Sequence, residues 1–544
     1  MRFTRSSGIL LHPSSLPGRF GIGDLGPEAH RFVDFLAETG QGWWQVLPLG
    51  PTGGMNSPYQ SHSSFAGNFL LISPEAMVEH GWLQPGDLPD KLNSKPNWVD
   101  FPAVARLKER LLRRAFQKCA GDDPGFQRFL EASTHWLDDY ALFEALKKES
   151  AGKPWFKWAP ALVARQPAAL AKWREKLAGE IRYQQFVQYV FAIQMQKLRD
   201  HCLEKQIKLI GDIPIFTAHD SADVWSRPDL FFLDRRGRPT VQAGVPPDLF
   251  SSTGQLWGNP LYRWEVHEQE GFKWWIDRLS ALLVWVDVIR IDHFRGFEAY
   301  WEVPGKAKTA ATGRWVKSPG VAFFQALQQR FIDLPLIAED LGVITAEVDA
   351  LREQFDLPGM RVLQFGFATS ASEEKYLPHR FVSHCVAYTG THDNDTSVGW
   401  LTTSNAQTTL SREEVQAERA YALRYVGTDG KEFHWDMIRL AFGSVADVAI
   451  VPMQDLLGLG SSARMNIPGK AEGNWAWRFD AAQLSPTVRD RLAELTAVFG
   501  RWNGAIPERL DPHHVPRQAH TKPLVASKAT RHATRGKILK TKRS

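Results

Sequence analysis

The sequence has few cysteines and no long hydrophobic run. Its 544 residues include three cysteines, Cys119, Cys202 and Cys385, which lie far apart and form no CxxC pair. This number and spacing argue against a disulfide framework and against a thiolate zinc site. No stretch of about 18 apolar residues is available to span a bilayer, and the apolar run 8–11 is too short for a secretory signal. We therefore expect a cytoplasmic protein without a membrane segment.

Common cofactor signatures are absent or incomplete. The sequence contains no HExxH, and Asp393 and Asp395 lack the further ligands of a calcium loop. The run 21–26 matches GxGxxG, but nine residues with two prolines separate it from the preceding apolar run. A dinucleotide site needs the strand to lead directly into the glycines. We interpret this run as a glycine-rich turn and do not expect NAD binding.

The positive net charge is concentrated at the C-terminus. The whole chain carries +5, while residues 505–544 contain ten Lys and Arg and two acids, which leaves residues 1–504 at −3. This segment has no apolar period and is typical of a disordered basic tail. Contact with nucleic acid or another anionic polymer stays open. We favour a solvated extension without a specific partner.

The rest of the chain has a globular composition, with 43% hydrophobic and 23% charged residues. Short apolar or β-branched runs that end in polar residues predict eight strands, at 8–12, 43–48, 207–216, 286–292, 336–340, 361–365, 385–393 and 448–455. Apolar residues at helical spacing predict helices between them, including 27–38, 183–205, 322–331 and 346–355. This alternation predicts an α/β protein, a (β/α)8 TIM barrel with its active site at the C-terminal ends of the strands.

Two connections are much longer than a barrel requires. Residues 49–206 separate the second and third strands and look largely helical, and residues 217–270 separate the third and fourth and are rich in Pro, Gly, Trp and Phe. Loops of this length are usually functional. We expect a catalytic barrel over 1–504 with two large inserted subdomains that roof a groove at its C-terminal face, followed by the disordered tail 505–544.

Three acids stand at or just beyond the ends of separate predicted strands: Asp292, Glu339 and Asp393. A retaining glycosidase needs two carboxyl groups about 5 Å apart, and neighbouring strands lie about 4.8 Å apart. Asp292 and Glu339 close the fourth and fifth strands, so they could supply this pair. A single Asp after a strand is more often a turn or helix cap, but three such acids together favour catalysis.

The neighbours of these acids fit the same chemistry. Arg290 lies two residues before Asp292, on the same strand face, and we expect it to lower the pKa of Asp292. Glu339 follows an apolar run, so we expect burial to raise its pKa, as a general acid requires. His293 and His392 can donate hydrogen bonds to sugar hydroxyls.

Nine motifs, in order, resemble those of one enzyme family: SSGILLHPSSLPG, FGIGDLG, WWQVLPLGPTG, NSPYQSHSSFAGN, IGDIPIF, GVPPDLFSSTGQLWGNPLY, RIDHFRGF, AEDLG and GTHDNDT. They are similar to those of 4-α-glucanotransferases known as amylomaltase or disproportionating enzyme, which form glycoside hydrolase family 77 in the α-amylase clan. The resemblance covers residues 6–500 approximately. It implies a retaining enzyme that moves α-1,4-glucan segments from a maltooligosaccharide, or a starch-type or glycogen-type donor, to the 4-hydroxyl of glucose or another glucan.

The resemblance also assigns site residues. It implies that Asp292 is the nucleophile, Glu339 the acid/base and Asp393 the stabiliser of the transition state. The implied substrate contacts are Tyr59, Asp212, Gln255, Trp257, Arg290, His293, His392 and Asn466. Trp257 lies in a Gly-, Pro- and Ser-rich loop, where an indole could stack on a sugar ring. The loop 247–258 is the implied lid, and the family needs neither a metal nor an organic cofactor.

Alternatives from other classes remain. An α-amylase-like hydrolase would use the same acids in the same first steps, and only the loop motifs favour transfer. A catalytically silent glucan-binding or scaffold protein, acting through its basic tail, would not need all three acids. For partners we expect α-glucan substrates, no membrane and no nucleic acid, with the chain acting as a monomer or homodimer.

Overall fold

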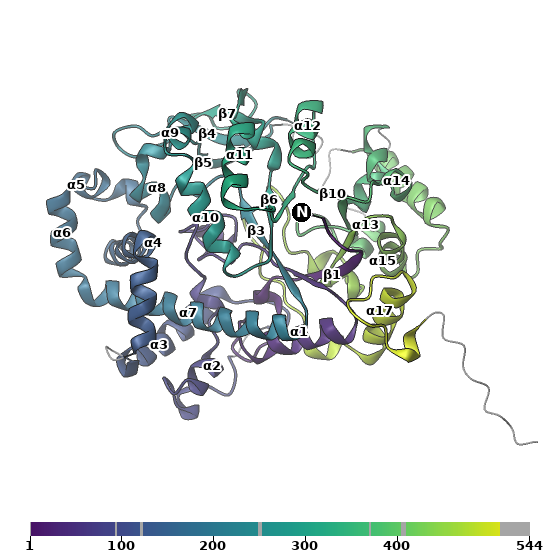
Figure 1. The fold of residues 1–544 in the computed structure, drawn as a ribbon, viewed down its shortest axis with the longest axis horizontal. Coiled ribbons are helices and arrows are strands. Elements are labelled where there is room, and N and C mark those ends of the chain that lie inside the picture. Colours follow the sequence, from purple (N-terminus) through teal and green to yellow (C-terminus); the bar gives the residue numbers. More distant parts are fainter. Residues whose placement is uncertain are drawn as a thin grey trace, which may run out of the picture.

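Eight parallel strands form a closed barrel at the centre of the molecule (Figure 1). The computed structural model describes residues 2–92, 95–119, 123–247, 253–368, 371–403 and 410–511. The ring follows chain order: β1 (Ser6–Leu10), β2 (Trp43–Gln45), β3 (Lys208–Pro214), β6 (Val288–Asp292), β9 (Leu336–Ala338), β10 (Gly359–Val362), β11 (Cys385–Tyr388) and β12 (Val448–Pro452). Each of the eight predicted strands contributes one barrel strand, so the predicted TIM barrel is confirmed.

The barrel strands are buried along nearly their whole length, because parallel strands in a barrel are covered on both faces. Their register positions the acids. β6 pairs with β9 so that Arg290 lies opposite Ile337 and Ile291 opposite Ala338. The next pair in this register is Asp292 and Glu339.

Helices lie outside the strands, as the apolar spacing predicted. α1 (Pro27–Glu38) begins with a proline in its first turn, where a missing N–H costs nothing. α7 (Ala178–Glu204) starts five residues earlier than predicted, whereas α11 (Gly320–Arg330) and α12 (Ala346–Gln354) lie close to their predicted bounds. The other barrel helices are α10 (Lys273–Leu283), α13 (Ser397–Thr402), α14 (Arg412–Val426), α15 (Phe433–Gly443), α16 (Met453–Leu456) and α17 (Pro486–Val498).

None of the eight barrel strands has the predicted bounds at both ends, and β10 and β11 show the reasons. β10 begins at Gly359, two residues early, because Gly359 pairs with Cys385 and the Asp340 carboxylate accepts the Met360 N–H at 2.7 Å. Residues 363–367 then form a 3-10 turn. β11 ends at Tyr388 rather than 393, because the following residues leave the ladder to form a loop.

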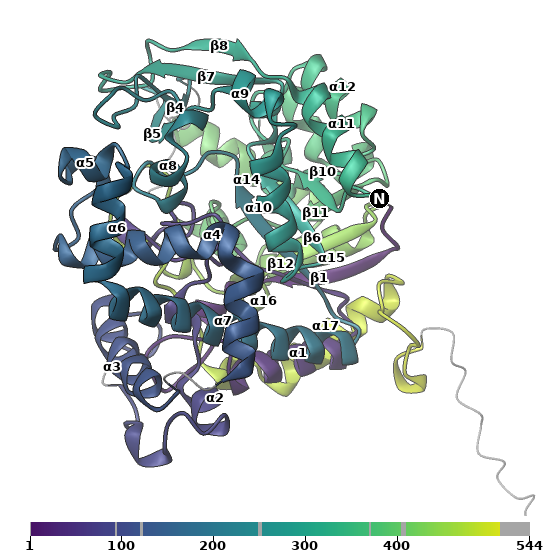
Figure 2. The ribbon, with the colours of Figure 1, turned by 60° about the vertical axis from the view of Figure 1, so that its left-hand side comes forward.

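Helices fill most of the chain between β2 and β3: α2 (Pro74–Glu79), α3 (Phe101–Cys119), α4 (Pro124–Glu149), α5 (Pro160–Val163), α6 (Pro167–Lys176) and α7. In both views α3 to α7 lie together on one side of the barrel (Figures 1 and 2). A buried ion pair between Lys108 of α3 and Asp24, 2.7 Å long, fixes the glycine-rich turn 21–26 against this layer. The turn 21–26 is thus bonded to α3 through Lys108.

The second long connection contains α8 (Ala222–Ser226), β4 (Val241–Val245), β5 (Gln255–Pro260) and α9 (Trp264–Gln269). β4 and β5 join β7 (Ala299–Pro304) and β8 (Arg314–Lys317), which follow β6, in an antiparallel sheet of order β5-β4-β7-β8. Figure 2 shows β7 and β8 at the top of the molecule. No pattern in the sequence predicted this sheet, because its strands come from two separate connections.

Among the described residues, none of the helices combines the length and the apolar character that a membrane span needs. The predicted basic tail falls, from residue 512 onward, outside the described residues.

Candidate active site

Asp292 and Glu339 rise from neighbouring strands at the C-terminal end of the barrel. Asp292 is the last residue of β6, and Glu339 directly follows β9. The backbones are joined on both sides of the pair: the Glu339 N–H donates to the Ile291 carbonyl at 3.1 Å, and the Phe294 N–H donates to the Glu339 carbonyl at 3.2 Å. The ladder between β6 and β9 therefore places the two residues side by side.

His293 turns the chain sharply after Asp292. Its φ of 52° lies in the left-handed region, which is uncommon outside glycine. Its N–H donates to Oε2 of Glu339 at 2.7 Å. Burial, with a smaller effect from Arg295, lowers the pKa of the His293 ring to about 3, so the ring is neutral at physiological pH. The Trp257 indole meets this ring edge to face, with centroids 4.9 Å apart, and the Trp257 Nε1–H donates to Gln255 Oε1 at 3.4 Å.

Arg290 connects two carboxylates within the barrel. Its Nη1 lies 2.9 Å from both carboxylate oxygens of Asp212 on β3, and its Nη2 lies 3.0 Å from Oδ1 of Asp292. Burial raises the pKa of Asp292 to about 6, and the Arg290 charge opposes this rise. Arg290 thus lowers this pKa, as expected, but burial, which the sequence did not predict, outweighs it. Asp292 is still mainly ionised at neutral pH.

The pKa of the Glu339 carboxyl group is also raised. Burial raises its pKa well above the usual value; the charge of Asp292 adds to the rise, and Arg290 and the His293 N–H oppose it. This is the direction that the apolar run before Glu339 predicted. Both carboxyl groups thus have raised pKa values, about 6 for Asp292 and well above the usual value for Glu339, and a general acid needs a raised pKa.

The third acid lies in the loop after β11. The Asp393 side chain is about half exposed, and the Asn466 Nδ2–H donates to its Oδ1 at 2.6 Å. Nε2 of His392 lies 3.4 Å from the same oxygen. The Asn466 N–H also donates to the His392 carbonyl at 3.1 Å, which fixes the two loops together.

Tyr59, from the connection after β2, joins the third acid to the barrel interior. Its ring stacks on His392 with centroids 5.0 Å apart, and its hydroxyl donates to Oδ2 of Asp212 at 2.7 Å. Contacts therefore connect every predicted site residue in one region: Tyr59, Asp212, Gln255, Trp257, Arg290, Asp292, His293, Glu339, His392, Asp393 and Asn466.

Two neighbours of this region were missed from sequence. Trp475 approaches Tyr59 and His392, with ring centroids 5.7 and 5.9 Å away, and has a left-handed φ of 66°. Arg464 donates from Nη2 to the Asp393 carbonyl at 2.9 Å. Nothing local marks one tryptophan among 21 or one arginine in a loop as part of a site.

No metal site accompanies the three acids within the part of the chain that the structure describes: no group of three or more His, Cys, Asp or Glu side chains there could hold an ion. The implied lid 247–258 falls partly outside the described residues, which omit 248–252.

Comparison with known proteins decides the family. A family model described as 4-alpha-glucanotransferase, glycoside hydrolase family 77, matches residues 11–484. The chain belongs to this family. The 4-alpha-glucanotransferase of Thermus thermophilus is 48% identical over 514 residues, covering 92% of this chain and 100% of the relative. The 4-alpha-glucanotransferase of Synechocystis sp. is 46% identical over 506 residues, covering 91% and 98%.

A solved structure agrees with this 4-alpha-glucanotransferase assignment. Amylomaltase from Streptococcus agalactiae in complex with acarbose superposes with a TM-score of 0.87 at 37% identity, covering 92% of this chain and all of that chain. Membership of this family favours transfer over the hydrolase alternative.

Proposed function

We propose that the chain transfers α-1,4-glucan segments by a two-step retaining mechanism. The observation that carries the proposal is the pair of acids that the register of β6 and β9 places at neighbouring strand ends, with the Glu339 carboxyl group bonded by the N–H of His293, next to Asp292. Asp292 attacks the anomeric carbon of the donor while Glu339 protonates the leaving oxygen, which gives a β-glycosyl-enzyme. The released glucan fragment then leaves.

In the second step Glu339, now ionised, accepts the proton of the acceptor 4-hydroxyl. That oxygen attacks the anomeric carbon, the bond to Asp292 breaks, and the α-linkage is restored. The donor is a maltooligosaccharide or a starch- or glycogen-type glucan, and the acceptor is glucose or another glucan. Asp393, held by Asn466, bonds sugar hydroxyls and stabilises the distorted ring in the transition state.

The remaining polar groups orient the donor and acceptor. Arg290, paired with both Asp212 and Asp292, fixes the attacking carboxylate. His293 and His392 face the same region and can donate to sugar hydroxyls. Trp257 offers an indole face to an acceptor sugar. Transfer outcompetes hydrolysis only when a sugar is held better than water, and we assign this task to the long connections after β2 and β3.

Incubation of the purified protein with maltotriose tests the proposal. We expect both shorter and longer oligosaccharides, with the number of reducing ends unchanged, because every bond broken is replaced by a new one. Asp292→Asn should abolish turnover while glucan binding persists. A rise in reducing ends without longer products would support hydrolysis instead, and unchanged turnover by Asp292→Asn would remove the nucleophile assignment.

A cytoplasmic location is part of this proposal. The three cysteines carry free thiols, and Cys202 and Cys385 are buried. Unpaired thiols suit a reducing compartment, where disulfides rarely persist.

A further inference from the structure

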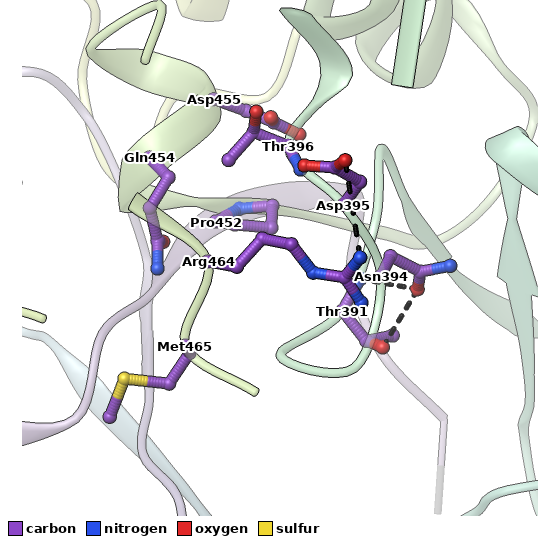
Figure 3. A pocket seen from close by; sticks show the side chains of 9 residues that line it. All are labelled: Thr391, Asn394, Asp395, Thr396, Pro452, Gln454, Asp455, Arg464 and Met465. Atoms are coloured by element: carbon purple, nitrogen blue, oxygen red, sulfur yellow. Dashed lines mark hydrogen bonds and ion pairs between the residues drawn. The ribbon is translucent and has the colours of Figure 1, made fainter. Parts of the chain in front are cut away.

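Two loops after neighbouring barrel strands meet behind Asp393. One loop, residues 389–396, follows β11, and the other, residues 457–466, follows β12 and α16. Figure 3 shows the Arg464 side chain extending from the second loop toward the first. Arg464 therefore lies where the two loops join.

The Arg464 guanidinium bonds two backbone carbonyls with its fork of N–H groups. Nη2 donates to the Asp393 carbonyl at 2.9 Å, and Nε donates to the Asn466 carbonyl at 3.2 Å. These are the two residues whose side chains bond each other at 2.6 Å. One side chain thus fixes the backbones of both the third acid and its hydrogen-bond donor.

Arg464 is itself held from behind. Its Nη1 lies 3.9 Å from Oδ2 of Asp395, and both side chains are only 14% exposed. The Asp395 carboxylate accepts the Ser461 hydroxyl at 2.8 Å and the Thr396 N–H at 2.8 Å. Figure 3 shows Arg464 and Asp395 facing each other, joined by a dashed line. At 3.9 Å the ion pair is loose, so the carbonyl bonds are the stronger constraint on Arg464.

We infer that Arg464 is a positioning residue that holds the Asp393 carboxylate in its working place. The inference rests on the proposed task of Asp393. That side chain is half exposed and has one short side-chain bond, to Asn466, so its place depends on where the two loops hold the pair. Stabilisation of a transition state requires a carboxylate fixed before the substrate arrives, because reorientation during the reaction would cost part of the gain.

A double-mutant cycle between Arg464→Gln and Asp393→Asn tests the inference, with maltotriose as the substrate. Arg464→Gln removes the guanidinium that bonds the two carbonyls. It should lower kcat by about 100-fold, the loss expected when the Asp393 carboxylate is misplaced by about 1 Å, with a smaller change in KM. In the Asp393→Asn background the same substitution should cause little further loss, because its target is already gone. Arg464→Lys keeps the charge and can bond one carbonyl, so it should recover part of the activity.

Arg5→Gln is the matched control. Arg5 likewise donates to backbone carbonyls, those of Phe442, Ser444 and Phe499 at 2.8–2.9 Å, but bonds neither Asp393 nor Asn466. It should keep the wild-type kcat. Thermal unfolding of each variant checks folding. If Arg464→Gln does not fold, Ser461→Ala, which loosens Asp395, replaces it in the cycle and should give a smaller loss that is again absent beside Asp393→Asn.

The outcomes separate the two claims. A wild-type kcat for Asp393→Asn would overturn the proposed task of Asp393. A large loss in Asp393→Asn with none in a folded Arg464→Gln would overturn only the positioning inference. Equal losses from Arg464→Gln in both backgrounds would also overturn it, because Arg464 would then act independently of Asp393.

Discussion

Asp292 and Glu339 should give the reaction a bell-shaped pH dependence. Asp292, with its pKa raised to about 6 by burial, must be ionised, and Glu339, with its pKa raised well above the usual value by burial and by Asp292, must be protonated. We expect kcat/KM to rise as pH increases through about 6 and to fall at higher pH as Glu339 loses its proton. The two apparent pKa values belong to the coupled pair.

Initial rates with maltotriose from about pH 4 to about pH 10 measure this profile. Asp212→Asn removes a charge that helps to raise the pKa of Asp292, so it should move the acidic limb to lower pH. A profile that stays flat through pH 6 would contradict the assignment of Asp292.

Glu339 should also lower the stability of the folded protein at neutral pH. Its pKa is higher in the folded protein than its ordinary value of 4.5. At a pH between these two pKa values, the folded state therefore binds more protons than the unfolded state. Stability contributed by the protonated form is therefore lost as pH rises above that ordinary value. Glu339→Gln cannot ionise and still accepts the His293 N–H, so its thermal midpoint should exceed that of the wild type at neutral pH.

The difference in midpoint should disappear below about pH 4, where the wild-type carboxyl is protonated in both states. Glu494→Gln, on the exposed face of α17, is the control and should leave the midpoint unchanged at both pH values. An equal gain at acidic and neutral pH would show that the effect does not arise from ionisation.

At the level of the elements, β1 and β2 depend on a glycine for their close approach. Gly8 lies opposite Trp43, and a Cβ added at Gly8 would stand 2.3 Å from the Trp43 carbonyl oxygen and 2.5 Å from its Cβ. Because backbone atoms of a barrel strand cannot move aside freely, Gly8→Ala should destabilise the protein by about 1–3 kcal/mol. A lower thermal midpoint, compared with the wild type, checks this.

Gly179→Ala is the matched control for Gly8→Ala. Gly179 lies in the first turn of α7, and a Cβ there would meet no atom within 4 Å. Alanine is the better helix former, so this variant should gain roughly 0.5–1 kcal/mol at most. A midpoint for Gly8→Ala equal to that of Gly179→Ala would show that β2 can move away from the added Cβ without loss of stability.

For the whole molecule, the catalytic unit should not need the basic tail. The Thermus thermophilus relative is matched over 100% of its length by 92% of this chain. Residues 512–544 contain nine basic and no acidic residues. A chain that ends at Asp511 should therefore keep the wild-type transfer rate and thermal midpoint.

Transfer from maltotriose and thermal unfolding compare the full chain with the truncated one. Retention on heparin at increasing salt gives a second comparison, since loss of nine positive charges should weaken non-specific binding to a polyanion. A truncated chain with much lower transfer activity would assign the tail a part in catalysis.

The sequence by itself determined the barrel and the identity of its acids. Buried parallel strands are nearly continuous apolar runs, so eight of them could be recognised without a partner in view. Asp292 and Glu339 directly follow two such runs, and motifs such as those around Asp393 and Tyr59 carried the family resemblance that also implied Asn466. Each of these signals lies within one short segment, so it can be recognised from the sequence alone.

Only the tertiary structure decided what depends on contacts between distant segments. The sheet β5-β4-β7-β8 joins strands from either side of β6, and no local pattern names the partners of an antiparallel strand. The net rise in the pKa of Asp292 reflects burial by segments far away in the chain, which outweighs the neighbouring Arg290. Arg464 bonds the Asp393 carbonyl although the two residues are 71 positions apart in the sequence. Burial and long-range hydrogen bonds arise when separate segments pack together, so the order of residues along one segment cannot fix them.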